Sequence, residues 1–216
     1  MKIFLSQPKR SDGLDQLKMA LAGKSSDIYL FPEGYLRGHQ AITETKAIMA
    51  GGTSTLVTSY LAGSNGRDMG LCLGPGGCDL IHREKSGVEG PLLQPSQAQV
   101  GGRTLGYLLC REIFLDYDHL MGCDIIFNPI GVGMFSEDQF KEWTSRASEI
   151  AKDLKAYVFG VSHADGSYRN CGFSIPIGFG LDPEGGFIYL SHTDTRSVVI
   201  DLDDHQVTYL EGVDYV

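Results

Sequence analysis

Short apolar runs separated by glycine-rich turns dominate this chain of 216 residues. It contains 28 glycines, many of them gathered in turns such as AGSNG, GPGG, VGG and PEGG. Such turns punctuate short β-strands, and in the N-terminal half helix-patterned segments alternate with the strands. This alternation predicts a sheet-rich α/β protein with inserted hairpins. The runs expected to form strands lie at residues 1–7, 28–33, 54–63, 70–84 (a hairpin), 104–110, 124–132, 157–163, 171–179, 185–191 and 197–203.

Three segments repeat apolar side chains at helical spacing, namely residues 12–22, 39–50 and 136–156. The last has the strongest pattern, with Ser136 as a plausible N-cap. A shorter helix is expected near Leu115. The apolar stripe of the third segment predicts packing against a sheet. It consists of Phe140, Trp143, Ala147, Ile150 and Leu154.

The charge and hydropathy of the chain exclude several classes of partner. A net charge of −9 and a pI near 5.0 argue against nucleic acid and anionic membrane surfaces, which require a basic face. No apolar run approaches the ~18 residues of a transmembrane helix. The apolar stretch in MKIFLSQPKR is too short for a signal peptide.

The cysteines and glycine motifs give no sign of a metal or a nucleotide cofactor. The 5 cysteines are an odd number and are scattered, which predicts reduced thiols in a cytoplasmic protein. The 6 histidines are dispersed, and no cysteine pair has zinc-finger spacing. The motifs GPGG and GVG lack the spacing of a dinucleotide-binding turn.

Three strand-like runs each end on a chemically reactive side chain. DIYLFPE ends at Glu33, CDLIHREK at Lys85 and TLGYLLC at Cys110. A thiol can attack an electrophilic carbon, a carboxylate can move protons, and an ammonium can stabilise the negative charge that develops. Each residue alone is more often a surface or core group, but together they predict covalent catalysis through a thioester.

The order and surroundings of these residues resemble the carbon–nitrogen hydrolase (nitrilase) superfamily. The resemblance implies a four-layer αββα sandwich formed by residues 1–216 as one domain. It also implies cleavage of a carbon–nitrogen bond in a small-molecule amide or nitrile by a homodimer that needs no metal or other cofactor. The features that carry it are Pro32-Glu33, Lys85, Cys110 followed by Arg111 and Glu112, and the strand GCDIIFNP.

Several positions depart from the superfamily's pattern. The lysine lies in REKSG, and the stretch between Lys85 and Cys110 is short. In the superfamily this stretch often carries a second glutamate that supports the lysine, for which Glu89 is the nearest candidate. Arg111 stands where nitrilases usually have tryptophan, which favours amide over nitrile substrates. Because Cys110 falls where a strand meets the following helix, the backbone N–H of Arg111 is expected to face the oxyanion, and the Arg111 side chain could bind a substrate carboxylate.

Other interpretations stay open. Cys110 could pair with His163, at the end of YVFGVSH, in a Cys–His hydrolase. The chain could keep the fold and bind a metabolite or partner without catalysis. It could also hydrolyse a nitrile, or transfer the acyl group of the same thioester to an amine.

The thiols are expected to differ in reactivity, with Cys110 labelled first by iodoacetamide because Lys85 favours its thiolate. Cys72, Cys123 and Cys171 lie in or beside apolar runs, where burial raises the thiol pKa. The segment FLDYDHLM, which follows Cys110, is the expected dimer surface.

Overall fold

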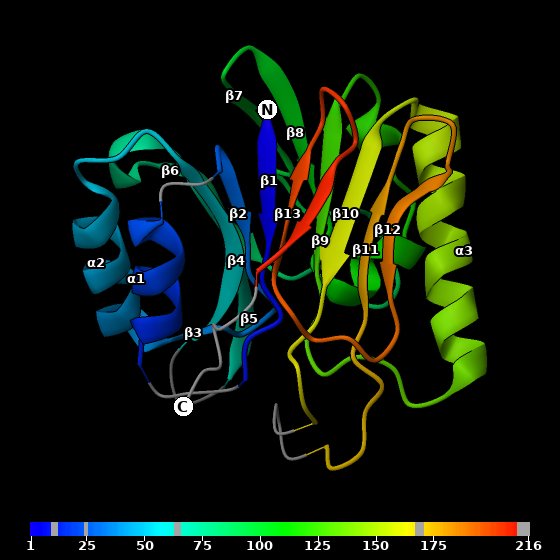
Figure 1. Ribbon diagram of the computed structural model, residues 1–216, viewed down its shortest axis with the longest axis horizontal. Helices are drawn as coiled ribbons and strands as arrows, with labels where there is room; N and C mark the ends of the chain where they lie inside the picture. The colour runs from blue at the N-terminus through cyan, green and yellow to red at the C-terminus, as the bar shows by residue number, and fades with distance from the viewer. Residues whose placement is uncertain (10–12, 24–25, 63–65, 167–170, 211–216) are drawn as a thin grey trace.

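The computed structural model describes residues 1–9, 13–23, 26–62, 66–166 and 171–210, and Figure 1 shows their arrangement. Within these ranges the strands form two sheets that lie face to face. Helices α1 (Asp15–Ala22) and α2 (Gly38–Met49) cover one outer face, and α3 (Glu137–Leu154) covers the other. The αββα sandwich that the resemblance implied is confirmed.

The first sheet has a parallel centre, because α1 and α2 carry the chain back between β1, β2 and β4. Its remaining pairs along the sheet are antiparallel. The strand order is β14 (Val207–Tyr209), β13 (Val198–Asp201), β1 (Lys2–Leu5), β2 (Ile28–Leu30), β4 (Thr55–Ala62), β5 (Arg67–Leu73) and β6 (Asp79–Glu84), with the short β3 (Leu36–Arg37) beside β4.

The second sheet repeats this plan, with β8, β9 and β10 parallel and α3 connecting β9 to β10. The strand order is β12 (Phe187–Ser191), β11 (Gly178–Leu181), β10 (Tyr157–Val161), β9 (Ile125–Pro129), β8 (Arg103–Tyr107) and β7 (Gln97–Val100). A bond from the Glu33 N–H to the Ile130 carbonyl, 3.1 Å long, ties the segment after β2 to the segment after β9. The carboxyl ends of these two strands therefore meet at one edge of the sandwich.

Successive side chains along each strand point to opposite faces of the sheet and so pack into separate core layers. On β2, Ile28 and Leu30 join the cluster between the sheets, whereas Tyr29 packs in the cluster beneath α1 and α2. On β9, Phe127 lies between the sheets and Ile126 packs toward α3. Because both faces are covered, these parallel strands read as continuous apolar runs.

The structure differs from the sequence-based expectations in the polar and irregular segments. The helix expected near Leu115 is a pair of 3₁₀ turns, Cys110–Phe114 and Asp118–Leu120. The strand expected at 171–179 begins only at Gly178, and Ile175 makes an isolated bridge to Met134. Strands β3, β7 and β14 were not predicted, because they are short or lack an apolar run. Residue 12, the expected start of α1, lies outside the described residues.

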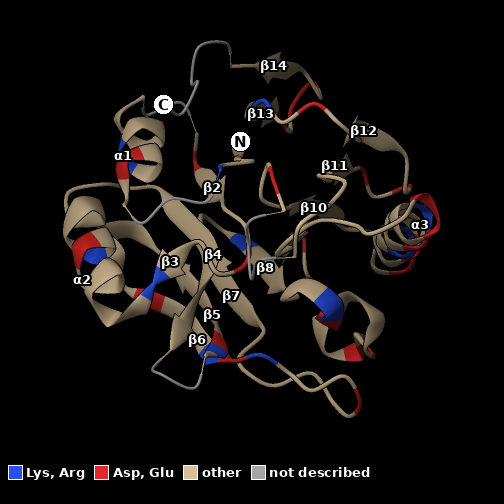
Figure 2. Cartoon of the chain, turned by 90° about the horizontal axis from the view of Figure 1, so that it is seen from below, with Lys and Arg blue, Asp and Glu red and all other residues tan. Residues whose placement is uncertain are grey.

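Charged residues line the exposed sides of α1, α2 and α3 (Figure 2). The apolar stripe of α3 packs on the second sheet as predicted, and Ser136 caps the helix by accepting a 3.1 Å bond from the Gln139 N–H. Among the helices of the described residues, none is long and apolar enough to cross a membrane.

Candidate active site

Glu33 is delivered to the site by the end of β2. The chain leaves the sheet after Leu30 and is held in place by bonds to the neighbouring strand β4, where Thr58 Oγ1 donates to the Pro32 carbonyl at 3.1 Å and the Gly34 N–H donates to Ser59 Oγ at 2.6 Å. The Glu33 N–H is tied to the other sheet, as described above. The backbone on both sides of the carboxylate is therefore fixed, and the side chain is buried.

Lys85 follows the last residue of β6 and points its ammonium at Glu33. Its Nζ lies 2.5 Å from Glu33 Oε1 and 3.9 Å from Asp68 Oδ2. The Lys85 N–H also donates to the Asp68 carbonyl at 2.8 Å, which extends the β5–β6 pairing by one residue. The Lys85 side chain is 22% exposed and that of Glu33 only 4%.

Cys110 sits on a strained turn at the end of β8. Its φ of 53° lies in the left-handed region, which costs a non-glycine residue about 1–3 kcal/mol. The turn is held by Asn128, whose Nδ2 donates to the Cys110 carbonyl at 3.0 Å and to the Leu108 carbonyl at 2.6 Å. A sharp, strained turn between a strand and a helical segment is the usual way to present a nucleophile.

The loop after β9 completes the surroundings of the sulfur. The Gly131 N–H hydrogen-bonds to Cys110, and the Glu33 carboxylate shares a hydrogen bond with the same thiol. The carbonyl of Gly131 in turn accepts a 3.0 Å bond from the His163 N–H. The predicted Glu33, Lys85 and Cys110 are thus brought together at the edge where the strands of both sheets end.

The pKa values suit a proton relay rather than a preformed thiolate. Burial, together with the Glu33 charge, raises the pKa of Cys110 to about 12, against the opposing effects of Lys85 and the Gly131 N–H. Burial also raises the pKa of Glu33, because desolvation outweighs the nearby Lys85 charge. Burial disfavours the Lys85 ammonium, but the charges of Cys110, Glu33 and Asp68 outweigh it and raise the pKa of Lys85. The raised pKa of Cys110 favours the neutral thiol near neutral pH.

A second buried ion pair connects the lysine segment to the cysteine turn. Arg83 makes a two-point contact with Glu112, through Nη1 to Oε1 at 2.8 Å and Nη2 to Oε2 at 2.7 Å. Glu112 also accepts the N–H groups of Ser86, at 2.5 Å, and Leu109, at 2.6 Å. Burial opposes ionisation of Glu112, but these hydrogen bonds prevail and lower its pKa. The pair sets the position of Lys85 relative to Cys110.

This pair and Asp68 are the functional features that sequence reasoning missed. The alternation on β6 gave a signal for the pair, because Ile81 and Arg83 share a buried face, and a buried arginine needs an anionic partner. Nothing in the sequence marked Asp68, because its approach to Lys85 depends on the β5–β6 register.

The two remaining predicted site residues lie at the surface. The Arg111 side chain, next to Cys110, is exposed. Glu89 is exposed in the segment between β6 and β7, and among the described residues the carboxylates that pair with Lys85 are those of Glu33 and Asp68. The structure does not bring Glu89 to the lysine, because the chain turns outward after Ser86.

His163 is buried, and its Nε2 lies 2.9 Å from the Glu33 carbonyl oxygen. A carbonyl oxygen only accepts, so Nε2 carries the proton and this nitrogen is engaged with the backbone of Glu33. This nitrogen therefore cannot be the base for Cys110, whereas the Glu33 carboxylate interacts with that thiol.

Of the other cysteines, two are buried and two are exposed. Cys72 and Cys123 are buried as predicted, and burial raises the pKa of each to about 12. The prediction for Cys171 is wrong: it is exposed, like Cys78, because the chain around it does not form the expected strand. Burial raises the pKa of Cys110 to about 12 while two other thiols are exposed, so the structure favours labelling of Cys78 and Cys171 before Cys110, the reverse of the expected order.

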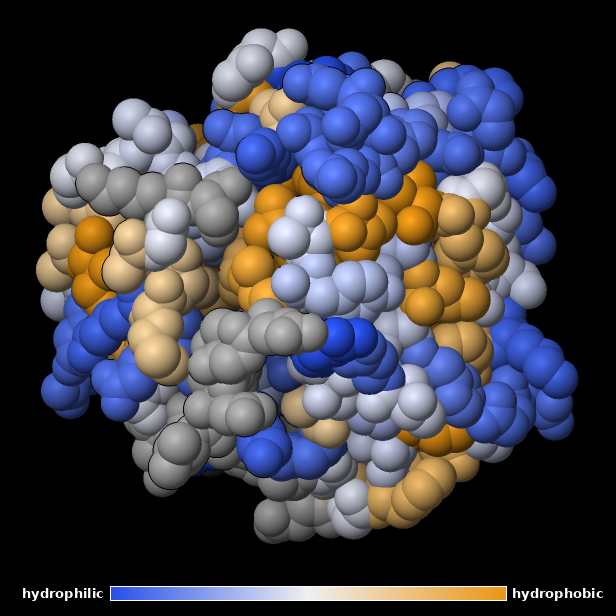
Figure 3. Space-filling model, in the orientation of Figure 1, coloured by the Kyte–Doolittle hydropathy of each residue, from blue (hydrophilic) through white to orange (hydrophobic). Residues whose placement is uncertain are grey.

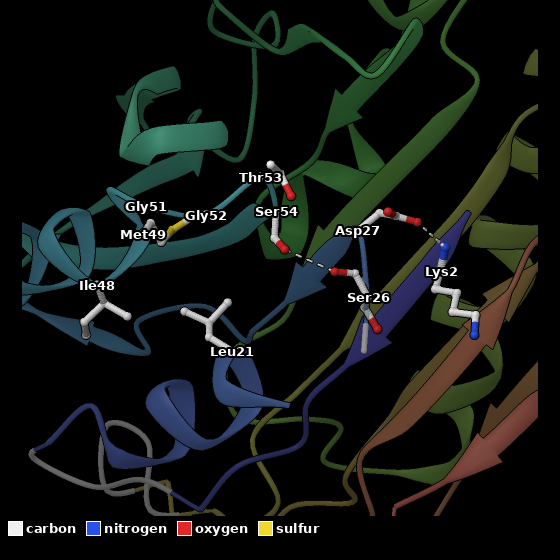
Figure 4. A pocket seen from close by; sticks show the side chains of 10 residues that line it. All are labelled: Lys2, Leu21, Ser26, Asp27, Ile48, Met49, Gly51, Gly52, Thr53 and Ser54. Carbon is white, nitrogen blue, oxygen red and sulfur yellow. Dashed lines mark hydrogen bonds between the residues drawn. The ribbon is translucent and has the colours of Figure 1, made fainter. Parts of the chain in front are cut away.

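A cleft of about 790 Å³ lies at the other end of the first sheet (Figure 4). Its walls include Lys2 at the start of β1, Asp27 before β2 and Ser54 before β4, whereas Glu33 follows the far end of β2. The Lys2 N–H donates to Asp27 at 2.7 Å, and Ser54 Oγ donates to the Ser26 carbonyl at 3.2 Å. The cleft is separate from the cluster of Glu33, Lys85 and Cys110.

The sequence matches no family model and no curated protein. Its fold is nevertheless similar to solved structures. A carbon–nitrogen hydrolase from Helicobacter pylori G27 has a TM-score of 0.73, covering 95% of this chain and 90% of that one at 12% identity. Nit3 of Saccharomyces cerevisiae, a member of branch 10 of the nitrilase superfamily, has a TM-score of 0.73, covering 92% and 88% at 13% identity.

A variant of an amidase from Nesterenkonia AN1, from the nitrilase superfamily, has a TM-score of 0.71. The match covers 94% of this chain and 91% of that one, at 18% identity. The chain therefore has the fold of the carbon–nitrogen hydrolase (nitrilase) superfamily, as the sequence resemblance predicted.

Proposed function

We propose that the protein is a carbon–nitrogen hydrolase that cleaves a small linear amide through a thioester on Cys110. One observation carries the proposal. The Glu33 carboxylate, buried where the two sheets meet, contacts both the Lys85 ammonium, at 2.5 Å, and the Cys110 thiol. A base placed between a cation and a nucleophile supplies the components of covalent acyl transfer.

In the first half-reaction Glu33 takes the thiol proton as the sulfur bonds to the amide carbon. The resulting oxyanion is stabilised by the Lys85 ammonium and by the backbone N–H of Arg111. Glu33 then gives its proton to the amide nitrogen, the carbon–nitrogen bond breaks, and ammonia or an amine departs. The raised pKa of Glu33 suits this role, because the group must accept and release a proton near neutral pH.

In the second half-reaction Glu33 takes a proton from water as the water oxygen attacks the thioester carbon. The oxyanion forms again beside Lys85, the carbon–sulfur bond breaks, and the sulfur recovers the proton from Glu33. The carboxylic acid product leaves and the site returns to its starting state. Every step uses protein groups and water alone.

Two features support an amide as substrate. Arg111 occupies the position where nitrilases usually have tryptophan. Among proteins of similar fold, a variant of the Nesterenkonia amidase carries the product of Michael addition of acrylamide at its active-site cysteine. In our proposal Cys110 is the matching nucleophile, and the exposed Arg111 side chain is placed to attract a substrate carboxylate.

The experiment is acid-quenched intact-mass analysis of the protein with a panel of small amides and nitriles. A Cys78→Ser/Cys171→Ser background removes the two exposed thiols, and Cys110→Ser in that background is the matched control. We expect an acyl adduct on Cys110 and, in ¹⁸O water, one labelled oxygen in the acid. Hydroxamate formation with added hydroxylamine would instead identify acyl transfer, and reaction of nitriles alone would identify a nitrilase. No adduct and no product with any compound would overturn the proposal in favour of a binding protein.

We further propose that the protein is a homodimer in a reducing, cytoplasmic compartment, which its 5 free cysteines support. In the expected dimer segment Leu115 and Leu120 are buried, whereas Met121 is 71% exposed. Figure 3 shows hydrophobic residues on the surface over β10 to β13, and on the edge strand β12 Phe187 and Leu190 are each 45% exposed. Sedimentation equilibrium at micromolar concentration measures the assembly state directly.

A further inference from the structure

Lys85 has a second carboxylate beside it, contributed by the neighbouring strand. Asp68 lies on β5, and its Oδ2 is 3.9 Å from Lys85 Nζ. The two residues are also joined through the backbone, since the Lys85 N–H donates to the Asp68 carbonyl at 2.8 Å. The Asp68 side chain is only 12% exposed, so water screens this contact weakly. The lysine is therefore held between Glu33 on one strand end and Asp68 on another.

The two carboxylates share one cation, and this affects proton transfer. The negative charge of Asp68 raises the pKa of Glu33, since it disfavours a second anion nearby. The same charge raises the pKa of Lys85, since it favours the ammonium. Asp68 thus makes Glu33 a stronger base and keeps Lys85 charged, which are the two properties that the proposed reaction needs.

We propose that Asp68 is the positioning residue of the site: it orients the Lys85 ammonium and shares its charge, the role that the sequence analysis gave to Glu89. The inference rests on the proposed function, because it assigns Lys85 to the oxyanion and Glu33 to proton transfer. Asp68 itself does not touch the reacting atoms. It acts through Lys85, and its backbone bond to Lys85 does not depend on the identity of its side chain.

The test compares Asp68→Asn with Asp68→Glu and with Asp79→Asn. Asp79 is a matched control, because it pairs with Lys46 at 2.7 Å on the adjacent strand β6 of the same sheet, at a more exposed position. We expect Asp68→Asn to lower kcat about 10- to 100-fold with KM within about twofold, a smaller loss than removal of an oxyanion donor itself. Asp68→Glu should recover part of the rate, and Asp79→Asn should leave it unchanged.

The pH–rate profile separates positioning from a general effect on folding. Without the Asp68 charge the pKa values of Glu33 and Lys85 both fall, so both limbs of the profile should move to lower pH. A loss of rate with unmoved limbs, or an equal loss in Asp79→Asn, would overturn the inference. Equal rates for Asp68→Asn and the wild type would overturn it as well.

A second readout needs no substrate. Carbon-13 NMR titration of the Glu33 carboxyl, assigned with Glu33→Gln, should show a lower pKa in Asp68→Asn than in the wild type. An unchanged Glu33 pKa overturns the inference whether or not a substrate is found. A lowered pKa in a protein that turns over no amide or nitrile supports the electrostatic action of Asp68 while the proposed function fails, so the two failures are distinguishable.

Discussion

Two buried glutamates, Glu33 and Glu112, lie close to Cys110, and each is paired with a cation. Their side chains are 4% and 1% exposed, so burial alone penalises both carboxylates. Yet the pKa of Glu33 is raised by this burial, whereas hydrogen bonds lower the pKa of Glu112 despite it. Equal burial has produced opposite protonation preferences.

The difference lies in the number and kind of donors. Glu112 receives two bonds from the Arg83 guanidinium and two from backbone N–H groups, so its ionised form is saturated. One oxygen of Glu33 accepts a hydrogen bond from the Lys85 ammonium. The carboxylate also interacts with the Cys110 thiol and with the nearby charge of Asp68. A saturated carboxylate holds structure in place, whereas a carboxylate with few donors can still exchange a proton. Glu112 therefore has a structural role, whereas Glu33 is suited to proton transfer.

The largest expected effect is on turnover. Glu33→Gln should lower kcat/KM on an identified amide by ~10³-fold or more, because proton transfer to and from the reacting groups is lost. Lys85→Ala and Cys110→Ala should abolish turnover as well, and all three variants should unfold cooperatively in urea. Steady-state kinetics and urea titration measure the two properties separately. Near-full activity in any one variant would remove that residue from the catalytic set.

The next effect is on stability, and it should fall on the other glutamate. Glu112→Gln leaves the Arg83 guanidinium buried without its counter-charge, which typically costs 3–5 kcal/mol, about the cost of breaking a buried pair. Urea unfolding should show this loss for Glu112→Gln and a much smaller change for Glu33→Gln. Replacing both partners, as Arg83→Met/Glu112→Leu, should recover only part of the stability, because the N–H groups of Ser86 and Leu109 then lose their acceptor. Equal destabilisation by the two single variants would erase the distinction between the two carboxylates.

The pH dependence of stability should have opposite signs at the two positions. Glu112 has a folded-state pKa below its ordinary value of 4.5, so the stability it provides is present above about pH 4.5 and is lost as the pH falls through the folded-state pKa. Glu33 has a folded-state pKa above 4.5, so its contribution is present below about pH 4.5 and is lost as the pH rises through that higher pKa. Urea unfolding at a series of pH values measures both slopes, each removed by the corresponding Gln variant. Slopes of the same sign would contradict the two opposite pKa shifts.

The sequence predicted the strands well where burial left a continuous apolar run, and for that reason it also found the strand ends at Glu33 and Cys110. Strand β14 could not be found in this way, because its short VTY segment pairs at a sheet edge and has no apolar run. Nor could the sequence locate Cys171, since the apolar residues of the expected strand there begin to pair only at Ile175.

The charged neighbours of the site were harder to predict for a different reason. Asp68 reaches Lys85 only through the β5–β6 register, and Glu89, although close in sequence, is carried outward by the following loop. Sequence distance was a poor guide to spatial distance at this point. The electrostatics of the thiol were likewise misjudged, because the effect of burial and of Glu33 on the Cys110 pKa exceeds that of Lys85.

The smallest expected effect concerns thiol labelling, and it also separates the two glutamates. In the wild type, iodoacetamide near pH 8 should label the exposed Cys78 and Cys171 before Cys110, because burial raises the pKa of Cys110 to about 12. In a Cys78→Ser/Cys171→Ser background, Glu33→Gln should speed labelling of Cys110 by about 3- to 10-fold, since the Glu33 charge raises that pKa and its loss favours the thiolate. Glu112→Gln should change this rate little, because its charge is matched by Arg83, and peptide mapping of the alkylated cysteine measures all of these rates. Slower labelling of Cys110 in Glu33→Gln would contradict this electrostatic expectation and would mean that the loss of Glu33 as the acceptor of the thiol proton outweighs the loss of its charge.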